Sequence, residues 1–275
     1  MTAALYLAGA DQVAAATVGD SFTLAGDEGR HAVTVKRTRV GETILVADGL
    51  GRALHLLVSS VDGKSLTGQV QAVHDYHQPR WTWRVVQGLA KGDRGDLSVE
   101  ILTEVGVHFL SAWQSRRSIV KWDAKADKGL AKWQATAREA AKQSRRAWVP
   151  QVHPELITPK SLARHVEQVG GLVLVAHEEA TTPLASVALP DAGPVTLLVG
   201  PEGGISPEEI AELTAAGAIP VLISDGVLRA STAGAVALAQ LQLLAQQQHG
   251  DAAATVDAPV DVSADVPADA SEAAR

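Results

Sequence analysis

The chain of 275 residues contains no cysteine, which excludes disulfide bonds and thiolate metal sites. No apolar run approaches the roughly 18–20 residues that a membrane-spanning helix needs, and the N-terminus lacks the basic segment of a signal peptide. The nine histidines show none of the spacings typical of a metal site. We therefore expect a soluble cytoplasmic protein with neither a membrane segment nor a bound metal.

Charge is unevenly distributed along the chain. The net charge of −7 is unusual for a protein that binds nucleic acid, but residues 250–275 alone contribute −5, and residues 80–150 carry 14 Lys and Arg against 7 Asp and Glu. All six tryptophans also lie within residues 80–150. A basic segment with interleaved aromatics is typical of phosphate contact and base stacking. Solvated helix faces above core tryptophans would give the same composition, so both interpretations stay open.

The chain divides into three regions. Residues 1–75 carry β-branched segments between Gly-Asp and Asp-Gly turns, which predict a small β-barrel. In residues 76–249, continuous apolar strands alternate with helices, which indicates an α/β domain with a parallel sheet covered on both faces. Residues 250–275 lack aromatics and any period, and they predict a disordered acidic tail. The expected strands are 44–47, 53–58, 65–73, 84–89, 107–112, 172–176, 195–199 and 220–223, and the expected helices lie near 95–105, 125–146, 161–169, 207–216 and 231–247.

A glycine-rich loop follows the strand expected at 195–199. The sequence there is Leu198-Val-Gly-Pro-Glu-Gly-Gly-Ile-Ser-Pro-Glu-Glu-Ile210. Ser206 and Glu209 form a capping box, with Pro207 at the first helical position, so a helix should begin here. Ligands of open α/β sheets bind where strands end, and glycines let the backbone approach them closely. A turn that only needs positive φ angles would use the same glycines.

The glycine-rich loop is neither a P-loop nor a dinucleotide fingerprint, because it lacks the Lys-Ser/Thr pair and the Gly-x-Gly-x-x-Gly spacing. A second loop, Ser224-Asp-Gly-Val-Leu-Arg229, also joins a strand to a helix, so the two loops can face each other across one crevice. Arg229 would hold a phosphate or base there, or else form a surface ion pair. His177 and Glu178 follow the strand at 172–176; an ordinary loop is favoured for them over a place in the crevice.

Four stretches together resemble the ribosomal RNA small subunit methyltransferase E family of the SPOUT superfamily, over residues 5–245. Each stretch is weakly specific alone, and their order and spacing are specific together. They are His31-Ala-Val-Thr-Val-Lys-Arg-Thr-Arg-Val-Gly-Glu42, Lys91-Gly-Asp-Arg94 with Thr103-Glu-Val-Gly106, Glu139-Ala-Ala-Lys-Gln-Ser-Arg-Arg146 with Val149-Pro150, and the loops 200–204 and Val227-Leu-Arg229.

The resemblance implies a PUA-like N-terminal β-barrel that binds RNA and a C-terminal SPOUT α/β domain with a trefoil knot. It implies a homodimer that uses S-adenosyl-L-methionine to methylate N3 of a uridine in the decoding region of 16S ribosomal RNA. The expected substrate is the assembled small ribosomal subunit. The expected cofactor-binding residues are Leu198, Gly200, Pro201, Glu202, Gly203, Ile223, Gly226, Val227 and Leu228. The expected RNA-binding residues are Arg30, His31, Lys36, Arg37, Arg39, Lys91, Arg94, Arg116, Arg117, Lys121, Arg145 and Arg146.

Two residues are candidates for a direct part in catalysis. Loss of the N3 proton leaves negative charge on the uracil ring, which Arg229 would stabilise. Glu202 would accept a proton or else hold the loop in shape. The chain departs from many family members, which have Leu-Gly in place of Ile223-Ser224, Arg in place of Gly226 and Glu in place of Ser231. A catalytic role for that missing Arg or Glu would not carry over. A ribose 2′-O-methyltransferase and a non-catalytic RNA-binding protein remain the alternatives.

Overall fold

The structure, a computed structural model, describes residues 3–77 and 80–250. The chain forms two compact units. The first comprises residues 3–77 with Ala141–Val149, a segment that the sequence placed in the second domain, and the second comprises residues 80–140 and 150–250. The acidic tail expected at 250–275 lies outside the described residues, apart from Gly250.

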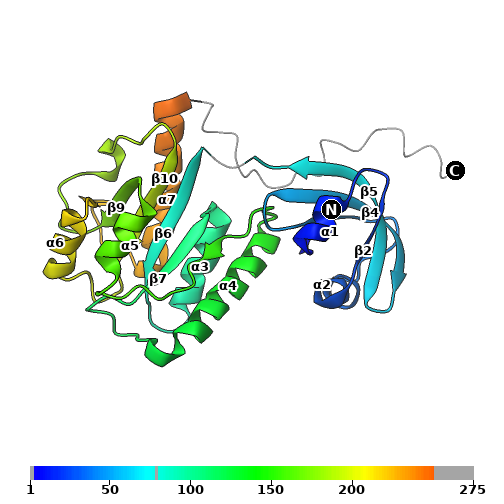
Figure 1. The fold of residues 1–275 in the computed structure, drawn as a ribbon, viewed down its shortest axis with the longest axis horizontal. Coiled ribbons are helices and arrows are strands. Elements are labelled where there is room, and N and C mark those ends of the chain that lie inside the picture. The colour runs from blue at the N-terminus through cyan, green and yellow to red at the C-terminus, as the bar shows by residue number, and fades with distance from the viewer. Residues whose placement is uncertain (1–2, 78–79, 251–275) are drawn as a thin grey trace. The chain divides into compact units, whose positions relative to one another are not determined.

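The first unit is built on a five-stranded sheet with the strand order β1-β3-β4-β5-β2 (Figure 1). β1 runs parallel to β3, and all other pairs are antiparallel. This order leaves β1 and β2 at the two edges of the sheet. The elements are β1 (Leu5–Leu7), α1 (Ala10–Ala15), β2 (Ser21–Leu24), α2 (Gly26–Arg30), the π-helix η1 (His31–Val35), β3 (Thr43–Ala47), β4 (Arg52–Asp62) and β5 (Ser65–Asp75).

Alternation along β4 gives this sheet two packed faces. Leu54, Leu56 and Val58 belong to one apolar cluster, and Ala53 belongs to another that also contains Ala147. The segment Ala141–Val149 therefore helps to close the first unit. Two features that the sequence did not predict are the short helices α1 and α2, and neither has a side-chain N-cap.

The second unit is built on a six-stranded sheet with the order β11-β9-β10-β6-β7-β8, in which every pairing is parallel. The strands expected in this region are confirmed, although β11 ends two residues earlier than predicted. The elements are β6 (Trp81–Gly88), α3 (Arg94–Val105), β7 (Phe109–Trp113), η2 (Asp123–Lys125), α4 (Ala126–Gln143), β8 (Gln151–Val152), α5 (Leu162–Val169), β9 (Leu172–Ala176), η3 (Leu184–Ser186), β10 (Gly193–Val199), α6 (Pro207–Ala215), β11 (Ile219–Val221) and α7 (Ala230–His249).

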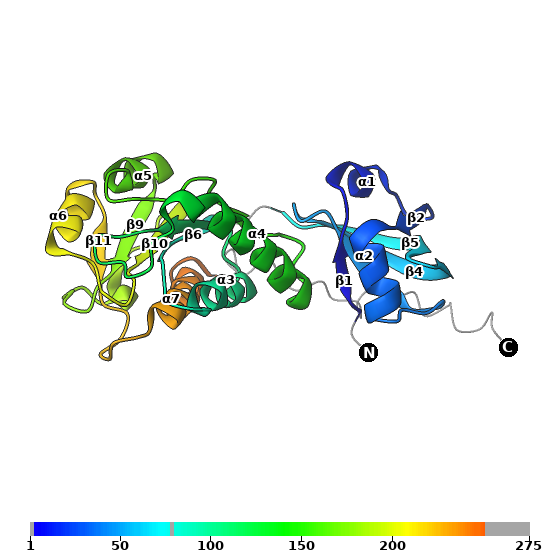
Figure 2. The ribbon, with the colours of Figure 1, turned by 90° about the horizontal axis from the view of Figure 1, so that it is seen from below.

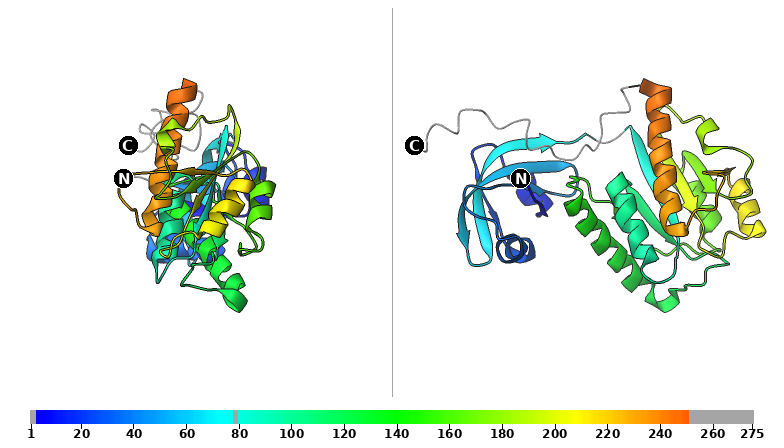
Figure 3. Two further views of the ribbon diagram at one scale, coloured as in Figure 1. Left: turned by 90° about the vertical axis from the view of Figure 1, so that its left-hand side faces the viewer. Right: turned by 180° about the vertical axis from the view of Figure 1, so that it is seen from behind.

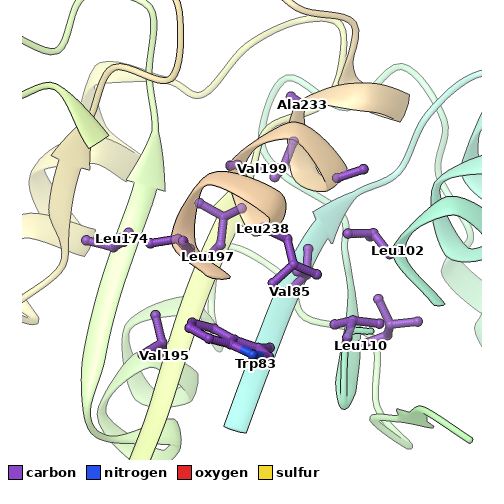
Figure 4. Packing of buried hydrophobic residues seen from close by; sticks show 14 of the residues in the cluster. Trp83, Val85, Leu102, Leu110, Leu174, Val195, Leu197, Val199, Ala233 and Leu238 are labelled. Atoms are coloured by element: carbon purple, nitrogen blue, oxygen red, sulfur yellow. The ribbon is translucent and has the colours of Figure 1, made fainter. Parts of the chain in front are cut away.

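Helices cover both faces of this sheet, as the continuous apolar strands predicted (Figures 2 and 3). Along β10, Val195, Leu197 and Val199 pack in the cluster that includes α3 and α7, and Leu198 packs in the cluster that includes α5 and α6. Figure 4 shows α7 lying across β10 and β6, with Leu238 above Leu197. The sheet and its helices therefore hold the carboxyl ends of the strands in fixed positions. The trefoil knot that the resemblance implies stays a prediction.

The tryptophans mostly build this core. Trp81, Trp83, Trp113 and Trp133 are each at most 7% exposed, so the core interpretation is confirmed for these four and base stacking on them is excluded. Trp122 is partly buried. Every helix within the described residues is too short or too polar to span a bilayer.

Candidate functional site

A pocket of about 720 Å³ opens at the carboxyl edge of the parallel sheet. Its walls are the loops that follow β9, β10 and β11, together with the start of α7. The sequence predicted that the loops after β10 and β11 face each other, and the structure brings both into this pocket. β9 lies between β10 and β11 in the sheet, so its loop completes the wall. This volume is within the range of about 300–1,000 Å³ that is typical of small-molecule sites.

The loop after β9 contributes His177, Glu178 and Glu179 to the pocket wall. The sequence favoured an ordinary loop outside the crevice. That interpretation is wrong, because the loop lines the pocket. The deciding fact is the strand order, which places β9 beside β10 although they are joined through η3 and a long connection. Local sequence carries no signal of that order.

Close approach of backbone explains two glycines of the loop after β10. A Cβ atom on Gly203 would lie 2.4 Å from the carbonyl oxygen of Arg117, and one on Gly200 would lie 2.7 Å from the Ile205 side chain. Gly204 has a φ of +74°, so the simple turn interpretation holds for this residue alone. The loop therefore lies tightly against the segment that contains Arg117.

Gly88, the last residue of β6, is part of the same arrangement although the sequence did not single it out. A Cβ atom there would lie 2.5 Å from the backbone nitrogen of Pro201. Only glycine lets the glycine-rich loop pass so close to the end of the neighbouring strand. A glycine at the last position of a strand was the available signal.

The capping box at the start of α6 is confirmed. The Ser206 hydroxyl accepts the Glu209 N–H at 3.2 Å, and the Glu209 carboxylate accepts the Ser206 N–H at 3.1 Å. The other carboxylate oxygen of Glu209, a fully buried residue, accepts the N–H of Arg116 at 2.8 Å. One carboxylate thus joins the helix start to the segment that covers Gly203.

Glu202 extends from the loop toward the turn that precedes α3. Its carboxylate accepts the backbone N–H of Lys91 at 3.1 Å and lies 3.7 Å from the Arg94 guanidinium. These contacts fix the turn at 91–94 against the glycine-rich loop. They agree with the loop-holding alternative for Glu202.

The loop after β11 is held by its own serine. The Ser224 hydroxyl donates to the carbonyl of Gly226 at 2.8 Å and accepts the Gly226 N–H at 3.1 Å. Such local bonds are the usual way in which serine stabilises a turn. Two of the departures from the family pattern, Ser224 and Gly226, therefore support each other.

Arg229 stands at the N-cap of α7 and lines the pocket. It is exposed, and among the described residues its guanidinium takes part in no ion pair within 4.0 Å, so the ion-pair alternative is not seen. Its backbone carbonyl accepts the N–H groups of Thr232 and Ala233 at 2.9 Å each. The first turn of α7 thus fixes the backbone of Arg229 and leaves its side chain available to a ligand.

Most of the expected cofactor-binding residues line the pocket. Leu198 does not, because strand alternation turns it into the core and brings Val199 to the pocket instead. Those that line it are Gly200, Pro201, Glu202, Gly203, Ile223, Gly226, Val227 and Leu228.

The expected RNA-binding residues lie on both units. In the second unit, Arg94 and Arg117 line the pocket, and Arg116 pairs with Glu212 at 2.7 Å. Lys91 and Lys121 are exposed. The first unit contains Arg30, His31, Lys36, Arg37, Arg39, Arg145 and Arg146.

Comparisons with protein families match both units. A family model described as an RNA methyltransferase domain matches residues 77–242, and one described as an RNA methyltransferase PUA domain matches residues 24–71. Ribosomal RNA small subunit methyltransferase E of Mycobacterium bovis is 44% identical over 230 residues, which cover 82% of this chain and 88% of that protein. The protein of the same name from Bacillus subtilis is 28% identical over 84% of this chain and 93% of its own length.

Solved structures agree with the sequence relatives. The crystal structure of ribosomal RNA small subunit methyltransferase E from Neisseria gonorrhoeae, bound to S-adenosyl methionine, superposes with a TM-score of 0.78 at 26% identity. The match covers 88% of this chain and 98% of that one. Both units of the fold described above therefore occur together in that relative.

Proposed function

Because the chain belongs to the ribosomal RNA small subunit methyltransferase E family, we propose that it methylates N3 of one uridine in the decoding region of 16S ribosomal RNA. The methyl donor is S-adenosyl-L-methionine, and the substrate is the assembled small subunit in the cytoplasm. The observation that carries the proposal is the pocket at the carboxyl edge of the sheet, where two glycine-bearing loops meet Arg229, which forms no ion pair with any other described residue.

The pocket suits S-adenosyl-L-methionine in size and in lining. Gly200, Pro201 and Gly203 present backbone to it, and Ile223 and Leu228 present apolar surface that suits the adenine ring. Gly226 and Val227 complete the rim. When bound, the cofactor supplies an electrophilic methyl group.

Arg229 is the residue that we place at the reacting base. N3 of uridine carries a proton at neutral pH, and its loss leaves negative charge on the ring. A guanidinium at the pocket rim stabilises that charge and orients the base. The target must be unpaired or turned out of its stack, because pairing hides N3.

Glu202 acts as a positioning residue in this proposal. Its carboxylate is occupied by the Lys91 N–H and lies beside Arg94. It therefore keeps the turn at 91–94 beside the glycine-rich loop, where the cations of that turn can meet RNA phosphates. The exposed cations of both units extend this contact.

We also propose that the chain acts as a homodimer. At the pocket rim, Val227 is 80% exposed, and Val236 and Leu243, seven residues apart on α7, are 37% and 54% exposed. Residues at this spacing share one helix face, which a second copy would cover. Light scattering after size exclusion tests this, and a monomer at micromolar concentration contradicts it.

The function is tested by methylation of purified small subunits with labelled cofactor. We expect one labelled nucleotide in 16S ribosomal RNA, identified as 3-methyluridine by mass spectrometry of the nucleosides. A label on ribose would identify a 2′-O-methyltransferase instead. Absence of transfer together with tight RNA binding would indicate a non-catalytic RNA-binding protein.

A further inference from the structure

A second, smaller pocket lies on the other side of the turn at 91–95. It measures about 150 Å³, the liquid volume of about five water molecules. Gly92 and Gly95 line this side pocket, and Arg94 lines the cofactor pocket. One short turn therefore separates the two.

Two tryptophans form the aromatic wall of the side pocket. Trp122 and Trp133 meet edge to face with ring centroids 5.3 Å apart. Trp122 is partly buried, so part of its surface remains available. Trp133 is buried and backs the wall, so the surface open to a base is that of Trp122, which can stack with any nucleobase because every base has a π face.

The position of Trp122 is strongly constrained. Its backbone N–H donates to the side-chain oxygen Oε1 of Gln114 at 2.8 Å, and the side-chain nitrogen Nε2 of Gln114 donates to the Asp123 carboxylate at 3.1 Å. Asp123 has a φ of +39°, a strained value for a residue other than glycine. Gly129 passes so close to the Trp122 ring that a Cβ atom would lie 2.6 Å from it. Gly129 lies in the first turn of α4, so the start of this helix packs directly against the Trp122 ring and fixes its position.

Charged groups lie at the same pocket. Asp96 and Lys132, which pair at 2.5 Å, both line it. The Lys132 side chain is 62% exposed. The pair offers an acceptor and a donor to the edge of a base that stacks on Trp122, and exposed Lys91 and Lys121 belong to the segments beside the pocket.

We propose that the side pocket binds a nucleobase of the RNA strand beside the target nucleotide. The proposal rests on the function proposed above and adds a second point of attachment for the substrate. The target base enters the cofactor pocket, the strand crosses the turn at 91–95, and a neighbouring base stacks against Trp122. Binding at two points would hold the target nucleotide out of its stack.

The test fills the side pocket without disturbing the fold. Gly95 lies in the first turn of α3, its φ is unstrained, and the nearest atom to an added Cβ is 3.7 Å away on Trp133. Gly95→Ala should therefore fold with a melting temperature at or above that of the wild type. Gly95→Leu adds three more carbons that fill the side pocket, and its melting temperature is measured alongside. The control is Leu97→Ala, an exposed change on the same helix outside both pockets.

The substrates are small subunits reconstituted with ligated 16S ribosomal RNA that carries one abasic nucleotide, placed in turn at each position near the target. For the wild type we expect kcat/KM to fall about 5- to 150-fold at one position, as loss of a stacked base predicts. Gly95→Leu should show the same fall in kcat/KM on intact subunits, and removing the base at that position should lower its kcat/KM no further. Cofactor affinity, measured by calorimetry, should not change.

The proposal is overturned if Gly95→Leu methylates intact subunits like the wild type. It is also overturned if the fall in kcat/KM caused by Gly95→Leu multiplies with the fall caused by every abasic substitution. Failure of the proposed function is distinguishable, because then the wild type would methylate no 16S uridine at N3 while still being folded. Leu97→Ala should match the wild type throughout.

Discussion

The buried carboxylate of Glu209 accepts the backbone N–H of Arg116 at 2.8 Å, across 93 residues of sequence. Through this bond the first turn of α6 holds the segment whose next residue, Arg117, covers Gly203. The glycine-rich loop is therefore enclosed between its own helix and the segment that follows β7, a strand two places away from β10 in the sheet. Glu209 positions the pocket without lining it.

Glu209→Gln should weaken both the fold and cofactor binding. The amide keeps one acceptor but turns a donor toward the N–H of Ser206 or Arg116, and an unsatisfied buried group costs about 1–3 kcal/mol. We expect a lower free energy of unfolding and a cofactor Kd raised several-fold in calorimetry. The matched control is Glu208→Gln, because Glu208 is exposed on the same turn. Equal effects in the two variants would contradict the role of Glu209.

Gly203→Ala should disrupt the cofactor pocket despite its small size. The added Cβ would lie 2.4 Å from the Arg117 carbonyl oxygen, and backbone must move to relieve that contact. We expect cofactor affinity to fall by at least tenfold, and a bulkier residue to abolish binding in calorimetry. Gly9→Ala is the control, since its Cβ would meet only the Gln12 side chain, at 3.6 Å or more. Normal binding by Gly203→Ala would remove this loop from the cofactor site.

Arg229→Ala should lose turnover and keep its cofactor. The exposed side chain lines the pocket and forms no ion pair with the residues that the structure describes, so its removal should leave the loops in place. Charge stabilisation of this kind is worth about 10²–10³ in kcat. Arg229→Lys should recover only part of the activity, because lysine keeps the charge but not the planar fork. Single-turnover methylation of small subunits measures both variants. Unchanged turnover of Arg229→Ala would exclude Arg229 from the mechanism.

Much of the second unit and its site could be predicted from the sequence. The apolar strands, the capping box and the two glycine-bearing loops are local patterns, and the structure has each of them. Long-range geometry was not predictable. The loop at His177 joins the pocket through strand order, Leu198 leaves it through strand alternation, and Gly88 matters only because a distant loop passes over it. Each of these depends on which segments become neighbours, and periodicity does not carry that information.

Arg37→Gly should keep or increase the stability of the fold and lose RNA affinity. It has a φ of +55° where the turn after η1 closes through the Thr38 N–H and the Ala32 carbonyl at 3.0 Å. A left-handed residue other than glycine costs about 1–2 kcal/mol, partly offset by the entropy of glycine. For Arg37→Gly we expect the free energy of unfolding to be unchanged or up to about 1 kcal/mol higher. The slope of log K against log salt should fall by about one.

Arg37→Ala separates the two effects in denaturant melts and salt titrations. It should lose the same RNA contact while keeping the strain, so its stability should match the wild type. Arg145, at φ +55° after α4, offers an independent repeat of the comparison. RNA affinity that is equal to the wild type in both Arg37 variants would contradict the phosphate contact.

His165 should make the fold sensitive to acid. His165, which lies on α5, is 5% exposed. Burial, and then the nearby His153 and Arg84, lower its pKa from 6.5 to about 4. Above pH 6.5 the side chain is neutral whether the chain is folded or not. Between pH 6.5 and 4 the unfolded chain binds the proton and the folded chain does not, so stability falls as pH falls. The shift corresponds to a loss of up to about 3 kcal/mol across this window.

His165→Phe keeps an aromatic ring of similar size and removes the titrating group. Urea melts at pH 7.5 and pH 4.5 should show the free energy of unfolding falling by about 2 kcal/mol more in the wild type than in the variant. His153→Gln removes the like charge next to His165. In this variant the acid-induced loss of the free energy of unfolding should be only slightly smaller than in the wild type, because burial is the larger cause of the pKa shift. An equal acid dependence in the wild type and His165→Phe would show that His165 is not the source.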